Sequence, residues 1–420
     1  MQSFSLYARD SAGLSDAELR AALAQSLEGR DLRRVLLLPP DHTRLHSGAG
    51  RIARILWELL SSRCEVDVMP ALGTHVAMTE AEWREMYAPI PYEKMIVHNW
   101  RADVERIGEV PAAFVREVSE GWMDEPVAVE VNRRLLDPGY DLILSIGQVV
   151  PHEVVGMANQ TKNLFVGCGG AAMINASHML GARYGLERIM GRDRTPVRAV
   201  FDYAEAHFLQ GVPVVYLLTV TTAPGGDVCI HGLFAGRERA RFEEAVRLSQ
   251  EKNVFYVGRP LTRAVVWLDP DEFKSTWLGN KAVYRTRMAM ADGGELLILA
   301  PGVERFGEDP AIDALIRRYG YRGRETILAQ ARERSDLREN LSAAAHLIHG
   351  SSDGRFRITY CTRRLSADEV RGVGYDWISF DEAVRRFDPA RLQPGWNDLS
   401  DDPVYFIPNP ALGLWSARKL

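Results

Sequence analysis

Three segments with the pattern of short strands, each followed at once by a loop with polar side chains, constrain the fold of this chain more than any other feature. The segments with their loops are 35–38 with 39–44, 65–71 with 72–75, and 141–146 with 147–152. Ser15 and Glu18 have the spacing of a capping box ahead of a first helix. A second helical spacing follows the first loop, at Ile52, Ile55, Leu56, Leu59 and Leu60. Strands that alternate with helices predict a mostly parallel sheet with helices on its faces.

The length of the chain adds a second domain to this prediction. A chain of 420 residues exceeds the size of one ordinary hydrophobic core. The strand pattern restarts after residue 260, with apolar segments at 264–268, 294–300 and 357–361. We therefore predict an α/β protein of two domains, 1–260 and 261–390, with mostly parallel sheets flanked by helices. We expect the tail, 391–420, to pack back on the first domain, and the active site to lie in the interdomain cleft.

Composition excludes several classes of function. The net charge of −5 gives no basic surface for nucleic acid or for an anionic membrane. No run of about 18 apolar residues is present, and the first residues lack the pattern of a signal peptide. The cysteines, which are Cys64, Cys168, Cys229 and Cys361, show no C-x-x-C spacing, so we expect neither a zinc knuckle nor a disulfide framework. We expect a cytoplasmic protein with a small-molecule substrate, and no nucleic acid or membrane partner.

The polar loops suggest where such a substrate binds. Each loop follows the carboxyl end of a predicted strand, and in open parallel sheets this edge forms the ligand crevice. His75, His152 and the loop 41–44 are therefore expected to converge there. Two imidazoles that face one substrate suit a reaction that takes and returns protons from opposite sides.

Other motifs carry less information about function. The glycine motif at 372–374 comes late and lacks the third glycine of a dinucleotide fingerprint. The loop 167–170, Gly-Cys-Gly-Gly, allows two interpretations: a phosphate cradle, or a tight turn that needs positive φ. We expect His42 and His46 to orient the 41–44 loop. The histidines that we interpret as structural are His98, His207, His231, His346 and His349.

Lys162 and His178 each allow two interpretations from the residues alone. A lysine beside an apolar, glycine-rich segment is a covalent attachment point if it is partly desolvated, and otherwise an ordinary surface lysine. His178 lies in a helical segment and is either a functional group or a packed core residue.

The order and spacing of these residues resemble the nickel-dependent lactate racemase family. The shared signatures are Asp-His-Thr-Arg at 41–44, Gly-Thr-His at 73–75, Pro-His at 151–152, Lys162 and His178. His152 precedes Lys162 by ten positions, and Lys162 precedes His178 by sixteen. A later element, 280–284 leading to Gly293 and Gly294, contains Lys281. The resemblance spans roughly residues 30 to 300.

The resemblance implies a nickel pincer nucleotide, pyridinium-3-thioamide-5-thiocarboxylic acid mononucleotide, bound covalently to Lys162 through a thioamide. It implies that His178 is the protein ligand of the nickel, beside two sulfurs and a ring carbon of the cofactor. Asp41 and Arg44 are then cofactor-binding residues, and Arg44 and Lys281 are candidates for binding the substrate carboxylate. His75 and His152 are the expected catalytic acid/base pair.

The activity that the resemblance implies is a racemase or epimerase that inverts C2 of a 2-hydroxy carboxylate by hydride abstraction and return. The chain departs from the family at Asn159-Gln160-Thr161, where a glycine-rich stretch is typical, and at Leu278, where a glutamine is typical. The local sequence around Lys162 and His178 is similar to that of a branch of the family, the sugar-acid 2-epimerases. The expected substrate is therefore an aldonate such as D-gluconate or D-mannonate.

Three alternative functions remain at this stage. The first is a racemase of lactate or another small 2-hydroxy acid. The second is a metal-dependent hydrolase or lyase that binds its metal directly through His42, His75 and His152. The third is a non-catalytic sensor of sugar acids that keeps the crevice but does not need the histidines.

Overall fold

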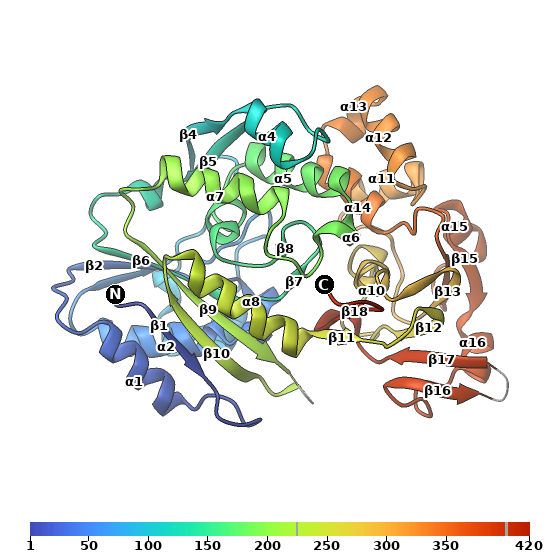
Figure 1. The fold of residues 1–420 in the computed structure, drawn as a ribbon, viewed down its shortest axis with the longest axis horizontal. Coiled ribbons are helices and arrows are strands. Elements are labelled where there is room, and N and C mark those ends of the chain that lie inside the picture. Colours follow the sequence, from blue (N-terminus) through green and yellow to red (C-terminus); the bar gives the residue numbers. More distant parts are fainter. Residues whose placement is uncertain (224–225, 400–401) are drawn as a thin grey trace. The chain divides into compact units, whose positions relative to one another are not determined.

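The computed structural model describes residues 1–223, 226–399 and 402–420, which form two compact units. The first unit comprises Met1–Ser177 and Gly191–Asn253, and the second comprises His178–Met190 and Val254–Leu420. Each unit has one six-stranded sheet flanked by helices (Figure 1). The predicted α/β class with mostly parallel sheets is confirmed.

The sheet of the first unit has the strand order β1-β10-β9-β6-β2-β3. Its strands are β1 (Phe4–Tyr7), β10 (Cys229–Gly236), β9 (Val214–Thr222), β6 (Leu142–Gln148), β2 (Arg34–Leu38) and β3 (Glu65–Val68). The four strands from β9 to β3 are parallel, whereas β10 and β1 add an antiparallel edge. The chain leaves β2 for β3 on one side and later returns to place β6 on the other. The carboxyl ends of β2 and β6 therefore form the topological switch point, where open α/β sheets bind ligands.

Local sequence explains these elements. Residues Val35 to Leu38 of β2 are all fully buried, as expected for a central parallel strand. Helix α1 (Asp16–Ser26) begins at the predicted capping box, because Ser15 and Glu18 bond each other's backbone N–H groups. The other helices are α2 (Ala49–Leu60), α3 (Glu80–Tyr87), α4 (Ala112–Val118), α7 (Pro196–Phe208) and α8 (Arg239–Asn253).

Short elements surround the carboxyl edge of this sheet. An antiparallel pair is formed by β4 (Val104–Val110) and β5 (Val127–Asn132), and a small hairpin by β7 (Pro151–His152) and β8 (Gly156–Met157). A 3₁₀ helix, η1 (His42–Ser47), follows β2, and a π-helical turn, η4 (Asn163–Gly167), follows the hairpin. Helix α5 (Ala171–Tyr184) comes next and passes from the first unit into the second at His178.

The second unit repeats the parallel pattern with the strand order β15-β14-β13-β12-β17-β16. Its strands are β12 (Leu261–Trp267), β13 (Met290–Ala300), β14 (Arg357–Thr362), β15 (Asp376–Ser379), β16 (Gly395–Leu399) and β17 (Asp402–Ile407). Only β16 is antiparallel to its neighbour. The longer helices are α11 (Pro310–Tyr319), α12 (Arg324–Glu333) and α14 (Leu341–His349). The shorter ones are α6 (Leu186–Ile189), α9 (Thr276–Gly279), α10 (Lys281–Thr286), α13 (Ser335–Arg338), α15 (Ala367–Gly372) and α16 (Phe380–Arg386).

The tail belongs to this second unit, whereas the sequence analysis separated it from the 261–390 domain; its packing on the first domain stays a prediction. Strand β17 pairs with β12, so that Ala264 lies opposite Tyr405 and Val266 opposite Ile407. Strand β18 (Leu414–Ser416) pairs with β11 (Val254–Tyr256) in the same unit. The physical reason is that β12 would otherwise be an unpaired edge strand of an apolar sheet.

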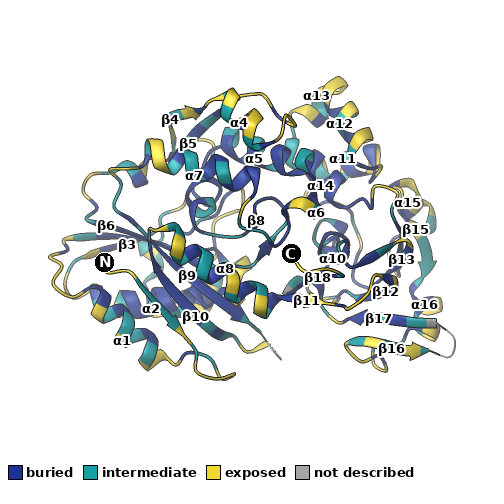
Figure 2. Ribbon diagram, in the orientation of Figure 1, coloured by how far each residue is buried: buried dark blue, intermediate teal, exposed yellow. Residues whose placement is uncertain are grey.

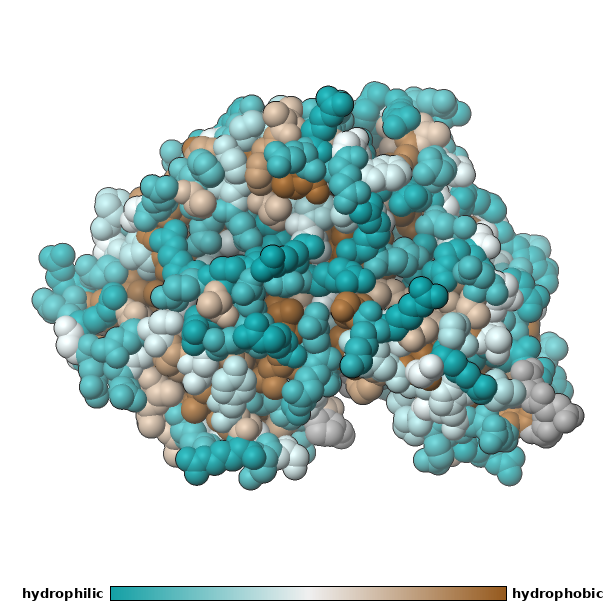
Figure 3. Space-filling model, viewed as in Figure 1, coloured by the Kyte–Doolittle hydropathy of each residue, from teal (hydrophilic) through white to brown (hydrophobic). Residues whose placement is uncertain are grey.

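Burial follows the layers of each unit. In Figure 2 the strands of both sheets are largely buried, whereas the outer faces of the helices are exposed. The face drawn in Figure 3 is mostly hydrophilic, with apolar side chains in small separate groups. Within the described ranges, no helix combines the length and apolar character needed to cross a membrane.

Candidate active site

The carboxyl edge of the first sheet carries the residues that the sequence singles out. Strands β6, β2 and β3 are consecutive, parallel neighbours in the sheet, so the loops that follow them meet at one edge. Asp41 comes three residues after the end of β2, and His75 comes seven residues after the end of β3. The predicted convergence of the polar loops is confirmed for these two residues, because their side chains are in contact.

Asp41 and His75 form a carboxylate–histidine pair. Asp41 is buried, with 5% of its surface exposed, and its Oδ2 lies 2.5 Å from Nδ1 of His75. The hydroxyl of Thr43 donates to the other carboxylate oxygen at 2.6 Å. Burial by itself would raise the pKa of Asp41, but the hydrogen bond and charge of His75 hold that pKa below its ordinary value. Because a carboxylate accepts the Nδ1 proton, the neutral ring of His75 presents an unprotonated Nε2.

His152 has the opposite arrangement. It lies in the β7–β8 hairpin, and its Nδ1 accepts a hydrogen bond of 3.1 Å from the backbone N–H of Val154. The neutral ring of His152 therefore carries its proton on Nε2. The carboxylate of Glu153 lies 3.7 Å from Nδ1. His75 is thus arranged to accept a proton at its Nε2, and His152 to donate one from its Nε2.

Lys162 is partly buried and is not an ordinary surface lysine. Its pKa is lowered from 10.5 to about 8, mainly by burial and next by the positive charge of Arg44. The carboxylates of Glu153 and Asp41 act on it in the opposite direction. Lys162 therefore lies within electrostatic reach of the 41–44 loop and of the hairpin that carries His152. About a tenth of its amine is therefore uncharged at pH 7, far more than for a lysine with the ordinary pKa of 10.5.

Asn163 holds Lys162 at the switch point of the sheet. Its Nδ2 donates to the carbonyl oxygen of Leu38, the last residue of β2, at 3.1 Å, and to Oγ of Ser145 in β6 at 2.9 Å. Nothing in the local sequence pattern marks Asn163, because these partners lie 125 and 18 residues away along the chain. Its place directly after a candidate lysine is the only signal that sequence offers.

The glycine-rich loop 167–170 needs its glycines for close packing. Gly167, Gly169 and Gly170 do not have positive φ, so the prediction of a turn that requires it is wrong. A β-carbon on Gly169 would lie 1.9 Å from the carbonyl oxygen of Phe165, and one on Gly170 would lie 2.1 Å from a carboxylate oxygen of Glu130.

The N-terminus of α5 is capped from within the protein. The same carboxylate oxygen of Glu130 accepts from the backbone N–H of Ala172 at 3.1 Å. A protein carboxylate therefore takes the place that the phosphate-cradle interpretation assigns to an anion. His98 is buried behind this loop, where its Nε2 bonds the carbonyl oxygen of Gly169 at 3.1 Å and its Nδ1 accepts from Asn132 at 2.9 Å. These contacts give His98 the structural role predicted for it.

The 41–44 loop presents one exposed cation. Arg44 bonds the hydroxyl of Thr43 at 3.1 Å, and within the described residues it makes no ion pair with a carboxylate. His42 bonds Glu85 of α3 at 2.8 Å and so ties the loop to that helix, whereas His46 is exposed. Among residues 1–223, 226–399 and 402–420, no group of three or more His, Cys, Asp or Glu side chains is placed to hold a metal ion. The geometry thus gives no support to direct metal binding by His42, His75 and His152.

His178 and Lys281 belong to the second unit. His178 is the eighth residue of α5 and is half-buried. Lys281 is the first residue of α10, and its Nζ lies 5.6 Å from the centre of the Phe273 ring. Leu278 is half-buried at the adjacent turn of α9. The roles of His178 as a nickel ligand and of Lys281 as a substrate contact stay predictions.

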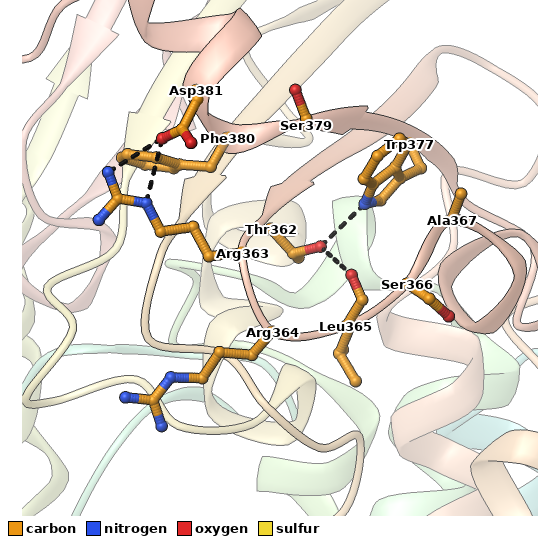
Figure 4. A pocket seen from close by; sticks show the side chains of 10 residues that line it. All are labelled: Thr362, Arg363, Arg364, Leu365, Ser366, Ala367, Trp377, Ser379, Phe380 and Asp381. Atoms are coloured by element: carbon orange, nitrogen blue, oxygen red, sulfur yellow. Dashed lines mark hydrogen bonds and ion pairs between the residues drawn. The ribbon is translucent and has the colours of Figure 1, made fainter.

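A separate cavity of about 480 Å³ lies at the carboxyl ends of β14 and β15 in the second unit (Figure 4). Its two arginines have carboxylate partners: Arg363 pairs with Asp381 in the cavity wall at 3.0 Å, and Arg364 pairs with Glu304 outside it. The indole of Trp377 donates to the hydroxyl of Thr362 at 2.9 Å. None of the predicted site residues lines this cavity.

The first unit is thus an open α/β sheet with a histidine–carboxylate pair and a partly buried lysine at its carboxyl edge. Residues 16–186 match the family model described as the lactate racemase N-terminal domain. Among solved structures, a protein from Thermotoga maritima is 24% identical, with a TM-score of 0.80 over 98% of this chain and 99% of that one. The lactate racemase apoprotein from Thermoanaerobacterium thermosaccharolyticum is 15% identical, with a TM-score of 0.72 over 97% and 94%. No curated protein matches the chain. The fold is therefore that of these two structures, and the region that carries Asp41, His75, His152 and Lys162 is similar to a lactate racemase N-terminal domain.

Proposed function

We propose that this protein is a racemase or epimerase that inverts C2 of a 2-hydroxy carboxylate. The observation that carries the proposal is the partly buried amine of Lys162, within electrostatic reach of Arg44 and of the Asp41–His75 pair, at the switch point of the sheet. Such a site combines an attachment point, an anion-binding cation and a proton-transfer group. The similarity of residues 16–186 to the lactate racemase N-terminal domain supports the same reaction class.

The proposed cofactor is a nickel pincer nucleotide bound covalently to Lys162, with His178 as the protein ligand of the metal. The residues of the first unit fit such a group. The lowered pKa of Lys162 favours the uncharged amine that forms a thioamide, and the exposed guanidinium of Arg44 suits a nucleotide phosphate. When bound, this group supplies the acceptor and donor of the hydride at C2 of the substrate.

The protein's own side chains supply the proton steps. Nε2 of His75 takes the proton from the substrate hydroxyl, because Nδ1 is occupied by Asp41, whose negative charge stabilises the imidazolium. His152 carries its proton on Nε2 and returns a proton to the oxygen from the other side. For the opposite enantiomer the two roles are exchanged. Arg44 and Lys281 bind the substrate carboxylate.

The proposed substrate is a sugar acid such as D-gluconate or D-mannonate. Its support is the sequence around Lys162, together with the apolar side chain of Leu278 at a position where the lactate racemase family typically has a glutamine. A racemase for lactate or another small 2-hydroxy acid is the alternative within the same reaction class. Assay of gluconate, mannonate and lactate with one loaded preparation distinguishes these substrates.

Intact-mass measurement tests covalent attachment. The protein is produced together with cofactor-synthesis enzymes, and wild type is compared with Lys162→Ala. We expect a mass increase of one cofactor in the wild type and none in the variant. Racemase activity in a wild-type sample of unmodified mass would contradict attachment at Lys162.

The fate of the C2 hydrogen tests the reaction type. A loaded preparation is incubated with the aldonate in D₂O, and the product is examined by NMR. Hydride transfer keeps protium at C2. Extensive deuterium at C2 would contradict hydride transfer and would show that C2 loses its hydrogen as a proton instead. Unchanged binding of the aldonate, without turnover, by a loaded wild type and by His75→Gln would favour a sensor.

A further inference from the structure

The backbone just before Lys162 adopts a conformation that needs external support. Asn159 and Gln160 have φ values of 66° and 54°, in the left-handed region that costs non-glycine residues about 1 kcal/mol or more each. Asn159 fits because position 147 is a glycine: a β-carbon there would lie 1.9 Å from Nδ2 of Asn159. Two consecutive left-handed residues persist only where neighbouring groups hold them.

Arg198 of α7 makes the contacts that hold this corner. Its side chain is fully buried, and its guanidinium donates to the carbonyl oxygens of Met157 at 2.6 Å and Asn159 at 3.1 Å, and to Oγ1 of Thr161 at 2.7 Å. The guanidinium fork of Arg198 therefore binds the chain before and after the two left-handed residues, Asn159 and Gln160. The guanidinium also lies over the ring of Phe242, with its carbon 4.5 Å from the ring centre.

A second layer fixes this fork. The hydroxyl of Thr161 donates to the carboxylate of Asp202 at 3.1 Å, and Arg239 donates to the other oxygen of Asp202 at 2.7 Å. Within the described residues Arg198 itself has no ion pair with a carboxylate, so its charge acts on Lys162 without a directly paired anion. The sequence offers no sign of this arrangement, because Arg198 lies 37 to 41 residues from the groups it bonds.

We propose that Arg198 is the positioning residue of Lys162: its guanidinium fixes the left-handed corner and so holds the lysine amine in its partly buried place beside the 41–44 loop. This inference rests on the proposed function for the importance of Lys162 as a tether. It concerns the unloaded protein, however, and is tested without cofactor or substrate.

The test measures the titration of Lys162 in the apoprotein. Acylation by acetic anhydride is followed by peptide mass spectrometry from pH 6 to 11, with Lys252 as an internal reference. We expect the wild-type midpoint near 8. In Arg198→Met the corner relaxes and a positive charge is lost, so we expect the midpoint to rise by about one pH unit, which lowers the uncharged fraction at pH 7 nearly tenfold. Arg198→Lys keeps the charge but cannot form the fork, and a smaller upward shift is expected.

Arg237 provides a matched control. Like Arg198 it donates to two backbone carbonyls, those of Leu209 and Val212, but it holds a loop that does not carry Lys162. Arg237→Lys should lower the melting temperature without moving the midpoint of Lys162. Midpoints that stay at the wild-type value in both Arg198 variants, with a loss of melting temperature like that of Arg237→Lys, would overturn the proposal.

Thr161→Val keeps the test decisive if Arg198→Met does not fold. This substitution conserves volume, keeps Arg198, and removes one acceptor of the fork together with the link to Asp202. We expect a shift of the Lys162 midpoint in the same direction, and an unchanged midpoint in Thr161→Val and Arg198→Lys would refute the role. A shifted midpoint combined with an unmodified Lys162 in active enzyme would retain the positioning role and reject the proposed function.

Discussion

Both units have a parallel sheet with loops at its carboxyl edge, but the charged side chains at these two edges differ in whether they are neutralised. In the first unit the edge carries Lys162 with a lowered pKa and the exposed cation Arg44, which has no carboxylate partner among the described residues. In the second unit the edge above β14 and β15 carries Arg363, which pairs with Asp381 (Figure 4), and Arg364, which pairs with Glu304.

The contrast between the two edges means that the fold supplies a place where loops converge but does not by itself supply a function. A parallel sheet opens its loops at one edge in both units. Reactivity at that edge depends on charges that are desolvated or left for a ligand to neutralise. In the second unit the arginines at the edge already form ion pairs with carboxylates of the protein, as is common on protein surfaces.

The strongest test of the comparison is removal of the base from the reactive edge. We expect His75→Gln to lower kcat roughly 10³-fold in the loaded enzyme, because general acid–base groups contribute about 10²–10⁴. The measurement is epimerisation of the aldonate followed by NMR. His46→Gln alters an exposed histidine of η1, which follows the neighbouring strand β2, and serves as the control, with activity near wild type. Equal losses in both variants would contradict the assignment of His75.

The carboxylate behind this base should give the next largest effect. We expect Asp41→Asn to lower kcat about 10²-fold, because the amide no longer holds His75 in the tautomer with an unprotonated Nε2. The pKa of Asp41 is held below its ordinary value, so its stabilising effect is present above pH 4 and is lost as pH falls through the folded-state pKa. Acid unfolding should therefore depend less on pH in the variant.

A carboxylate at the opposite edge of the same sheet is the control for Asp41. Asp141 accepts from the backbone N–H groups of Arg33 and Arg34 at the amino end of the strands, and these bonds hold its pKa below its ordinary value. Asp141→Asn should change acid stability while leaving kcat near wild type. A comparable loss of kcat in Asp141→Asn would show that activity follows stability rather than position at the carboxyl edge.

The desolvated lysine should also cost the first unit stability. Lys162→Met is expected to stabilise the apoprotein at pH 7 by on the order of 2 kcal/mol, because burial of the ammonium is then relieved. The folded-state pKa of Lys162 is lowered, so between about 8 and 10.5 the unfolded wild type binds more protons and its stability rises with pH. The advantage of the variant should therefore shrink in that window. Urea unfolding at pH 7 and pH 10 measures both effects.

The matched substitution is Lys252→Met on α8, where the lysine is partly exposed and pairs with Glu251. Its free energy of unfolding should change by less than about 0.5 kcal/mol at either pH. A similar gain for both variants would mean that loss of any lysine, rather than of a desolvated one, stabilises the protein.

The smallest effect is expected at the neutralised edge of the second unit. Arg363→Ala removes an exposed ion pair with Asp381 and should change the free energy of unfolding by less than about 0.5 kcal/mol. The loaded enzyme should keep its kcat and KM. A large change in KM would show that the carboxyl edge of the second sheet also takes part in substrate binding, contrary to the contrast drawn between the two edges.

Local sequence was sufficient for the strands and for part of the site. The strands β2 and β6 were predictable because a buried parallel strand is typically a short apolar run, whereas β3 alternates charged residues with valines that are buried. The approach of the 41–44 loop to His75 was predictable because neighbouring parallel strands end at one edge. The pairing of β17 in the tail with β12 was not predictable, since it joins segments about 140 residues apart and leaves no local pattern in the sequence.

The supports of Lys162 were not predictable for the same reason. Asn163 reaches β2 and β6, Arg198 reaches back from α7, and Glu130 caps α5. Each contact joins residues 18 to 125 positions apart, and each depends on a fold that must already exist. The glycines at 169 and 170 were visible in the sequence, but the reason for them, close approach of Phe165 and Glu130, was not.

The class of fold and the candidate reactive groups could be read from the sequence, because strand periodicity, loop polarity and residue type are local properties. The tertiary structure alone decided their states. It buried Asp41 against His75, set opposite tautomers on His75 and His152, and lowered the pKa of Lys162. The physical reason is that desolvation and hydrogen-bond geometry depend on neighbours that folding brings together from distant parts of the chain.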